Sequence, residues 1–162
     1  AVREAVRITA NRKIGVIATA TTIGSGAFRK KLLEADPGVQ VYETACPLFV
    51  PLVENGFISD DDEIVRLVAE RYLADIKASG ADTLILGCTH YPFLTGAIRR
   101  IVGRGPEILD GSHGVAMQLG RRLAAAGMLR TQGGAGTVEF RNSLDEPEIL
   151  ALSRALLQYR ED

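Results

Sequence analysis

The apolar residues of the chain follow two alternating periods, and this alternation is the feature that most limits the fold. Short runs rich in β-branched residues alternate with longer stretches at helical spacing, which is typical of βαβ units. The predicted strands are Lys13–Ala18, Val39–Thr44, Asp82–Gly87, Glu107–Asp110 and Thr137–Arg141. The first and third runs are almost continuously apolar, as in parallel strands covered on both faces. The sequence therefore predicts an α/β fold with a mostly parallel sheet and helices on both faces.

The stretches between these runs are predicted to be helices. Their ranges are Ser25–Ala35, Asp61–Ser79, a helix beginning at Pro92, His113–Ala126 and Glu146–Tyr159, after a helix end at the start of the chain. The second range has the clearest signals: Ser59 and Asp62 resemble a capping box, and Gly80 supplies a C-terminal stop. Apolar residues also recur in it every four positions, at Ile64, Val68, Tyr72 and Ile76.

Composition narrows the class of protein. The 162 residues contain 46% hydrophobic residues, enough for a substantial core, and 19 Lys and Arg against 20 Asp and Glu. This balance lacks the basic excess of a nucleic-acid binder, and the apolar runs fall far short of the ~20 residues that cross a bilayer. Two cysteines 42 positions apart match neither a CxxC pair nor a zinc ligand set, so we expect free thiols in a cytoplasmic protein. The chain opens on Ala1 inside an apparent helix, and we expect the natural protein to begin earlier.

The segment Gly87–Pro92 is the most informative for chemistry, because it lies where a buried strand ends and a helix begins. Unpaired N–H groups and the positive dipole end of a helix favour a thiolate at Cys88 and attract a ligand carboxylate. His90, two residues on, could relay protons. The alternative is structural: Cys88 is a small buried residue that closes the strand, and His90 caps the helix.

A second polar turn, Thr19–Gly26, follows the first strand. Its hydroxyl and N–H groups suit an anion, but neither GxxxxGK[ST] nor GxGxxG is present, so the sequence does not support nucleotide binding. In the alternative interpretation, the threonines only cap the following helix.

The segment Ala45–Gly56 follows the second strand, and its two prolines and apolar filling predict a shaped wall. We expect Cys46 to be a packed core thiol. Glu54 is either a solvated charge or a carboxylate that reaches a histidine and holds its tautomer. His113 is predicted to start a helix, and two histidines without a carboxylate cluster do not support a metal site.

These motifs together resemble glutamate racemases of the aspartate/glutamate racemase family. The resemblance rests on Gly87–Pro92, on ACPLFVPLVE at 45–54, and on Ile14–Thr19 followed by Thr22 and Ile23, in the family's order. It implies two α/β lobes that enclose the amino acid, with one cysteine from each lobe on either face of its Cα and no cofactor. It also implies glutamate as substrate, D-glutamate supply for peptidoglycan synthesis and a possible homodimer.

The resemblance assigns roles to individual residues. Cys88 would be the base of the second lobe, His90 its partner in proton transfer, and Glu54 the carboxylate paired with that histidine. Three threonines would help to hold the substrate: Thr89, Thr19 and Thr22.

The sequence departs from the family pattern in two places. Ala18 stands where the family usually has glycine, which leaves less room at the turn. The family's Asp-Ser-Gly-Val-Gly-Gly, Pro-Tyr-Gly and Ala-Cys-Asn-Thr motifs, the last with the first catalytic cysteine, have no counterpart here. We therefore expect residues 1–112 to form the second lobe, with one half of the active site. Residues 113–162 would be a returning segment that completes a first lobe absent from this chain.

Two other functions remain open at the level of sequence. A Cys88, His90 and Glu54 arrangement could serve nucleophilic catalysis on acyl or amide substrates, for which one thiol suffices. The chain could also be a non-catalytic binding lobe. Cys46, inside the apolar wall, is a poor candidate for a second base.

Overall fold

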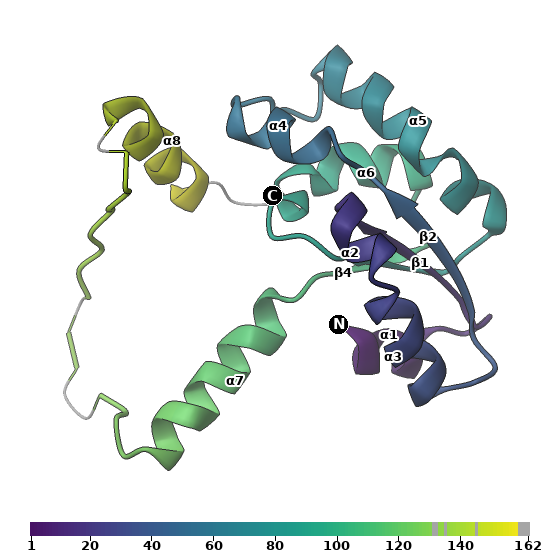
Figure 1. Cartoon of the computed structure of the whole chain (residues 1–162), viewed down its shortest axis with the longest axis horizontal. Coiled ribbons are helices and arrows are strands. Elements are labelled where there is room, and N and C mark those ends of the chain that lie inside the picture. Colours follow the sequence, from purple (N-terminus) through teal and green to yellow (C-terminus); the bar gives the residue numbers. More distant parts are fainter. Residues whose placement is uncertain (131–132, 135, 145, 159–162) are drawn as a thin grey trace. The chain divides into compact units, whose positions relative to one another are not determined.

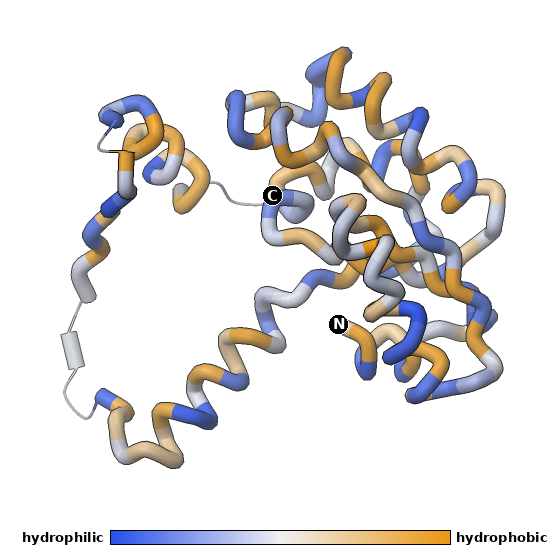
Figure 2. The backbone as a smooth tube through the Cα atoms, viewed as in Figure 1, coloured by the Kyte–Doolittle hydropathy of each residue, from blue (hydrophilic) through white to orange (hydrophobic). Residues whose placement is uncertain are grey.

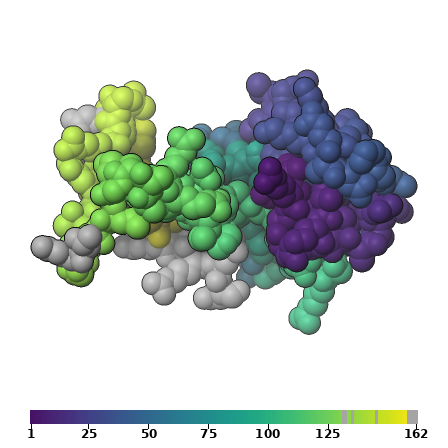
Figure 3. All heavy atoms as spheres, turned by 90° about the horizontal axis from the view of Figure 1, so that it is seen from below, coloured from purple at the N-terminus to yellow at the C-terminus, as the bar shows by residue number. Residues whose placement is uncertain are grey.

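The computed structural model of the protein describes residues 1–130, 133–134, 136–144 and 146–158. The chain divides into two compact units, Ala1–Gly111 and Ser112–Asp162. The atoms of the first unit, coloured purple to teal in Figure 3, form a closely packed body. This unit contains the sheet and every residue of the predicted site.

A four-stranded parallel sheet organises the first unit (Figure 1). Its strands are β1 (Lys13–Ala18), β2 (Gln40–Ala45), β3 (Thr83–Leu86) and β4 (Glu107–Leu109), in the order β2-β1-β3-β4. Strand β1 pairs with both β2 and β3, so it lies in the interior of the sheet. The predicted α/β class is confirmed, and the bounds of these four strands agree with the prediction to within one residue at each end.

Helices cover both faces of this sheet (Figure 1). The helical elements of the first unit are α1 (Val2–Ile8), α2 (Ala20–Gly24), α3 (Ala27–Ala35), α4 (Phe49–Glu54), α5 (Glu63–Ser79), the 3-10 helix η1 (Tyr91–Leu94) and α6 (Thr95–Val102). Ile14 and Val16 of β1 pack with Ala5 of α1 and Leu32 of α3 on one face. On the other face, Gly15 lacks a side chain, and Ile76 of α5 closes over it.

The apolar strands form the centre of the core. Figure 2 shows the central strands in the colour of hydrophobic residues, and Ile14, Val16 and Ile17 of β1 are fully buried, as are Leu84 and Ile85 of β3. Burying a side chain of this size contributes about 1.5–3 kcal/mol relative to leaving it exposed. The continuous apolar character of β1 and β3 is therefore explained by cover on both faces.

The long helix α5 has a different N-terminal cap from the predicted one. Asp62, not Ser59, is the N-cap, and its carboxylate accepts hydrogen bonds from the N–H groups of Ile64 and Val65. Ser59 caps only the preceding turn, where its hydroxyl accepts from Asp61 N. Gly80 ends the helix with φ 68°, as predicted, because glycine adopts the left-handed conformation without strain.

Two other helix predictions need correction. The helix expected over Ser25–Ala35 begins only at Ala27, as α3, because Ser25 is the C-cap of α2 and Gly26, with φ 63°, separates the two helices. The helix expected to begin at Pro92 starts as η1 at Tyr91 and becomes α-helical only from Thr95. The segment predicted as an apolar wall contains a helix, α4.

The second unit consists of two helices, α7 (Ser112–Ala125) and α8 (Pro147–Gln158). Both agree with the predicted ranges, although Tyr159 lies outside the described residues. The predicted strand Thr137–Arg141 is wrong: these residues have strand-like composition but form no strand. No helix among the described residues is long and apolar enough to span a membrane.

The second unit also leaves much of its apolar surface uncovered. Val115, Met117 and Leu119 of α7 are each more than half exposed, and so are Val138 and Leu157. None of the described residues of α7 is buried. This surface is unusual for a folded unit, since contiguous exposed apolar patches mark sites of association.

Asp82 connects two segments at the amino edge of the sheet. Its carboxylate accepts hydrogen bonds from Thr9 Oγ1 at 2.6 Å, from Ala10 N and Asn11 N at 2.7 Å each, and from Thr83 Oγ1 at 3.0 Å. Burial raises the pKa of Asp82, but these hydrogen bonds outweigh it, so that its pKa lies below the ordinary value for aspartate. The turn from α1 into β1 is thereby fixed to the start of β3.

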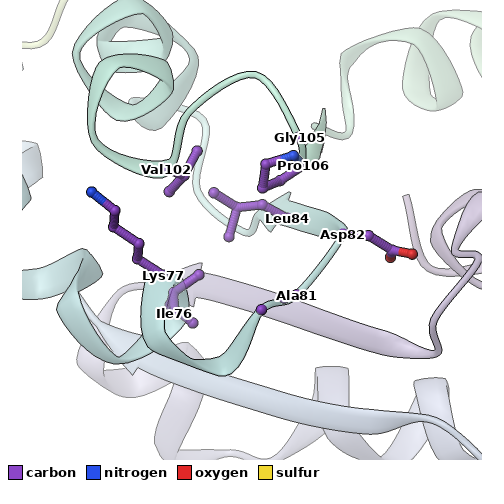
Figure 4. Close-up of a pocket in the computed structure, with 9 residues that line it drawn as sticks. Ile76, Lys77, Ala81, Asp82, Leu84, Val102, Gly105 and Pro106 are labelled. Carbon is purple, nitrogen blue, oxygen red and sulfur yellow. The ribbon is translucent and has the colours of Figure 1, made fainter.

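A pocket lies beside Asp82 at the same edge (Figure 4). The last turn of α5, the start of β3 and residues 102–106 form its walls. It contains none of the predicted site residues, which follow the opposite, carboxyl ends of the strands.

We predict that Asp82→Asn destabilises the first unit by about 1–2 kcal/mol at neutral pH, because an amide cannot accept all the hydrogen bonds that the carboxylate accepts. A depressed pKa contributes stability that is present above the unfolded-state pKa of about 3.9 and lost as the pH falls through the folded-state value. Urea unfolding should therefore show the largest difference from wild type near pH 7 and a smaller one below about pH 4.

The exposed Asp75 of α5 provides a matched control. Asp75→Asn should change stability by less than about 0.5 kcal/mol at either pH. Equal stability of Asp82→Asn and wild type at neutral pH would contradict the role of Asp82.

Candidate active site

Three loops leave the sheet at its carboxyl edge and begin side by side. The N–H of Cys46 donates to Ala18 O at 2.9 Å, and the N–H of Gly87 donates to Ile17 O at 2.8 Å. The loops after β2 and β3 thus start on either side of the end of β1. Parallel strands place all their carboxyl ends at one edge, which is where open α/β sheets bind ligands.

The loop after β3 carries Cys88, Thr89 and His90. Cys88 is a free thiol and partly exposed, so it is not the fully buried residue of the structural alternative. Its Sγ lies 3.9 Å from His90 Nδ1, and Thr89 Oγ1 lies 3.5 Å from the same nitrogen. His90 is the N-cap residue of η1, but its side chain makes no capping hydrogen bond. The imidazole is therefore directed to the thiol and not to the helix.

Glu54 reaches this histidine from the loop after β2. It is the last residue of α4, and its Oε1 lies 3.2 Å from His90 Nε2. The prediction that Glu54 and His90 lie within hydrogen-bonding reach is confirmed. The side chains are 58% and 32% exposed respectively, and exposed pairs contribute only about 0–1 kcal/mol to stability. The Glu54–His90 pair therefore contributes little to the stability of the fold.

The geometry determines how the imidazole can be protonated. A carboxylate only accepts hydrogen bonds, so Glu54 pairs with a protonated Nε2. In the neutral ring Nδ1 is then an acceptor, and it faces Cys88 and Thr89. A proton can therefore pass between the Cys88 thiol and the His90 imidazole, while the Glu54 carboxylate stabilises a charged ring. Contacts of this kind are often long without a bound substrate.

Thr19 and Thr22 lie in the loop after β1. Thr19 is the N-cap of α2: its Oγ1 accepts from Thr22 N at 3.3 Å and lies 3.0 Å from Thr22 Oγ1. Both residues are partly exposed at the carboxyl edge. Thr19 acts as a helix cap here and Thr22 lies within the helix that it caps, and contact of either residue with a substrate stays a prediction.

Ala18, which departs from the family pattern, faces a residue without a side chain. A Cβ atom placed on Gly87 would lie 3.0 Å from Ala18 Cβ and 2.9 Å from Phe28 Cε2. The absence of a side chain at Gly87 therefore makes room for the methyl group of Ala18, directly before Cys88.

Cys46 differs from Cys88 in its exposure and in its surroundings. It is fully buried, and its Sγ contacts Thr44 O at 3.8 Å. Burial raises the pKa of Cys46 to about 12. The prediction of a packed core thiol is confirmed. His113 lies in the first turn of α7, as predicted for a helix start.

Sequence reasoning missed the residue that joins the two loops, Tyr91. Its ring is fully buried, and its hydroxyl donates to Cys46 O at 2.9 Å. The partner is a backbone carbonyl 45 positions away, which has no signal of its own in a sequence.

No group of three or more His, Cys, Asp or Glu side chains within the described ranges is placed to hold a metal ion.

Comparison with known proteins shows the family of this chain. Residues 1–119 match the family described as Asp/Glu/Hydantoin racemase. The chain belongs to this family. The resemblance to glutamate racemases drawn from the sequence motifs is thereby confirmed, and the matched residues include the whole first unit.

Individual relatives are glutamate racemases. The protein from Chlorobaculum tepidum is 48% identical over 125 residues, which are 77% of this chain and 45% of that protein. The structure of glutamate racemase from Thermus thermophilus in complex with β-chloro-D-alanine has a TM-score of 0.73 at 38% identity, over 95% of this chain and 56% of the other. The enzyme from Francisella tularensis in complex with D-glutamate has a TM-score of 0.70 at 34% identity, over 82% and 49%. The chain thus spans about half the length of these relatives.

We predict that an alkylating reagent near neutral pH labels Cys88 well before Cys46. Cys88 is partly exposed beside an imidazole, whereas Cys46 is buried and its pKa is raised to about 12. Because the thiolate is the nucleophile, labelling of Cys46 should be at least about 100-fold slower. Peptide mass spectrometry over time gives both rates, and faster labelling of Cys46 would refute this description of the two thiols.

Proposed function

We propose that this chain supplies one half of the active site of a cofactor-independent glutamate racemase. The observation that carries the proposal is the contact of His90 with both Cys88 and Glu54 at the carboxyl edge of the sheet, in a chain that belongs to the racemase family. The relatives that act on glutamate are similar along most of this chain, which favours glutamate as the substrate.

In the proposed reaction, one thiolate removes the Cα proton and a thiol on the opposite face returns one. The Cα–H electron pair becomes part of a carbanion, and the S–H bond of the second thiol breaks as the new C–H bond forms. Without an electron sink from a cofactor, the barrier must be lowered by positioning and local charge. The roles of the two thiols reverse for the opposite enantiomer.

His90 and Glu54 would control the charge of Cys88. His90 Nδ1 can accept the thiol proton, and Glu54 stabilises the imidazolium that results. Thr89, Thr19 and Thr22 offer hydroxyl groups at the same edge for the charged groups of the amino acid. A second lobe that excluded water would strengthen each of these interactions.

The second thiol must come from outside these residues. Cys46, the other cysteine of this chain, is fully buried with a raised pKa, so it is unsuited to proton transfer with a substrate. We place residues 113–162 in the lobe that supplies this thiol, because the apolar side chains of α7 need a partner surface. A second copy of the chain is the other possible partner. D-Glutamate made in this way would serve peptidoglycan synthesis in the cytoplasm.

A second function is favoured by the same geometry. With His90 and Glu54 beside it, Cys88 can act as a thiolate nucleophile toward an acyl or amide carbon, and that reaction needs only one thiol. It would leave a covalent adduct on Cys88, which racemisation does not form.

We predict that the chain alone does not racemise glutamate, because it offers one accessible thiol to one face of Cα. Joined behind the N-terminal lobe of the Chlorobaculum tepidum relative, it should interconvert the two enantiomers. In this fusion Cys88→Ala should lower kcat by at least about 100-fold, as expected for the loss of a general base. A chirality-resolved assay measures all three proteins.

Cys46→Ala in the same fusion is the matched control and should retain racemisation. Robust racemisation by the unfused chain that Cys88→Ala abolishes would show a second base within these residues. An acyl adduct on Cys88 with amide substrates, together with an inactive fusion, would favour the nucleophilic enzyme.

A further inference from the structure

Tyr91 joins the two loops that carry Glu54 and His90. It directly follows His90, and its hydroxyl donates across the end of β1 to the carbonyl of Cys46, at the start of the loop that contains α4. Burial raises the pKa of the Tyr91 hydroxyl above its ordinary value, so the group stays protonated and can donate. The hydrogen bond is fully buried and is not weakened by competition with water.

The ring of Tyr91 makes a second connection between the loops. It meets Phe49 edge to face, with ring centroids 5.1 Å apart and an interplanar angle of 87°. Phe49 is the first residue of α4, and Glu54 is the last. Phe49 also packs against Tyr72 of α5, at 5.5 Å and 79°. The short helix is thereby fixed at the end opposite to its catalytic candidate.

The loop after β3 has two backbone attachments that the Tyr91 hydroxyl does not make. The Gly87 N–H donates to Ile17 O at 2.8 Å, and the Tyr91 N–H donates to Cys88 O at 3.2 Å, and Tyr91→Phe leaves both bonds in place. The position of Glu54 relative to His90, in contrast, depends on how α4 is held against η1. The Glu54 side chain is 58% exposed, and its Oε1 lies 3.2 Å from His90 Nε2.

We infer that Tyr91 is a positioning residue for the Glu54–His90 pair: its hydroxyl bond to Cys46 and its contact with Phe49 keep the Glu54 carboxylate on His90 Nε2, and through His90 they set the reactivity of Cys88. The consequence for proton transfer to a substrate rests on the proposed function. The effect on the thiol does not, because it is a property of the free chain.

The direction in which the alkylation rate of Cys88 changes distinguishes a positioning role of Tyr91 from a general loosening of the fold. If Tyr91 acts through the pair, then Tyr91→Phe moves Glu54 away from His90, and the imidazole is less well placed to accept the proton of the Cys88 thiol. Alkylation of Cys88 becomes slower. If Tyr91 only fills the core, then its loss leaves the Cys88 rate unchanged or makes it faster through greater exposure.

The experiment is a double-mutant cycle on the 162-residue chain, read by the alkylation rate of Cys88 between pH 6 and 9. Glu54→Gln should slow Cys88 near neutral pH by about three- to tenfold. Tyr91→Phe should slow it by a similar factor and add almost nothing in the Glu54→Gln background, because both act through one pair. The difference should shrink at high pH, where the thiolate forms without help from His90.

Tyr42→Phe is the matched control, because it removes a tyrosine hydroxyl that is exposed and donates to Gln40 Oε1 of its own strand, at 2.9 Å. It should leave the Cys88 rate unchanged, and the buried Cys46 should remain unlabelled in every folded variant. If Tyr91→Phe fails to fold, Phe49→Leu tests the same connection from α4 and should also slow Cys88.

Faster or unchanged labelling of Cys88 in Tyr91→Phe, or equal effects with and without Glu54, would overturn the inference. A Glu54→Gln variant that labels at the wild-type rate would also overturn it. None of these outcomes depends on racemisation, so an inactive fusion protein would count against the proposed function and leave this inference standing.

Discussion

A parallel sheet delivers the carboxyl ends of all its strands to one edge, and the candidate site depends on that constraint. Glu54 and His90 are far apart in the sequence, yet each lies in a loop that starts beside the end of β1. The interior position of β1 requires a strand buried on both faces, which its apolar run provides. Any change that removed β1 from between β2 and β3 would separate the carboxylate from the imidazole.

The sequence predicted the features that are local or that follow from this constraint. The four strands of the sheet and the long helix α5 with its Gly80 stop were accessible from apolar periods and helix-end signals. The Glu54–His90 contact was expected from the family resemblance, together with the common edge at which the strands end. It was wrong where the outcome depends on pairing with another strand or on the exact backbone geometry. Thr137–Arg141 has strand composition, but no neighbouring strand pairs with it. Ser59 and Asp62 are both capping residues, and only the backbone geometry selects Asp62.

The elements that support the site were the hardest to predict. The prolines of the segment after β2 obscured α4, although Pro51 lies within the helix. Tyr91 was visible only as part of a motif, because its hydrogen bond ends on a carbonyl and its ring contact depends on the fold. The six predicted site residues all lie in segments that follow the carboxyl ends of strands, and three of them, Cys88, Thr89 and Glu54, contact His90. Thr19 and Thr22 form a separate hydrogen-bonded pair.

The central claim is that Cys88 is one of two bases acting on opposite faces of Cα. The most direct test follows deuterium during early turnover of each glutamate enantiomer in D2O by the fusion protein. With two bases, the product gains solvent deuterium at Cα while the remaining substrate keeps its proton, because the abstracting and the donating groups differ. Deuterium that enters the remaining substrate as quickly as the product would indicate a single base and contradict the account.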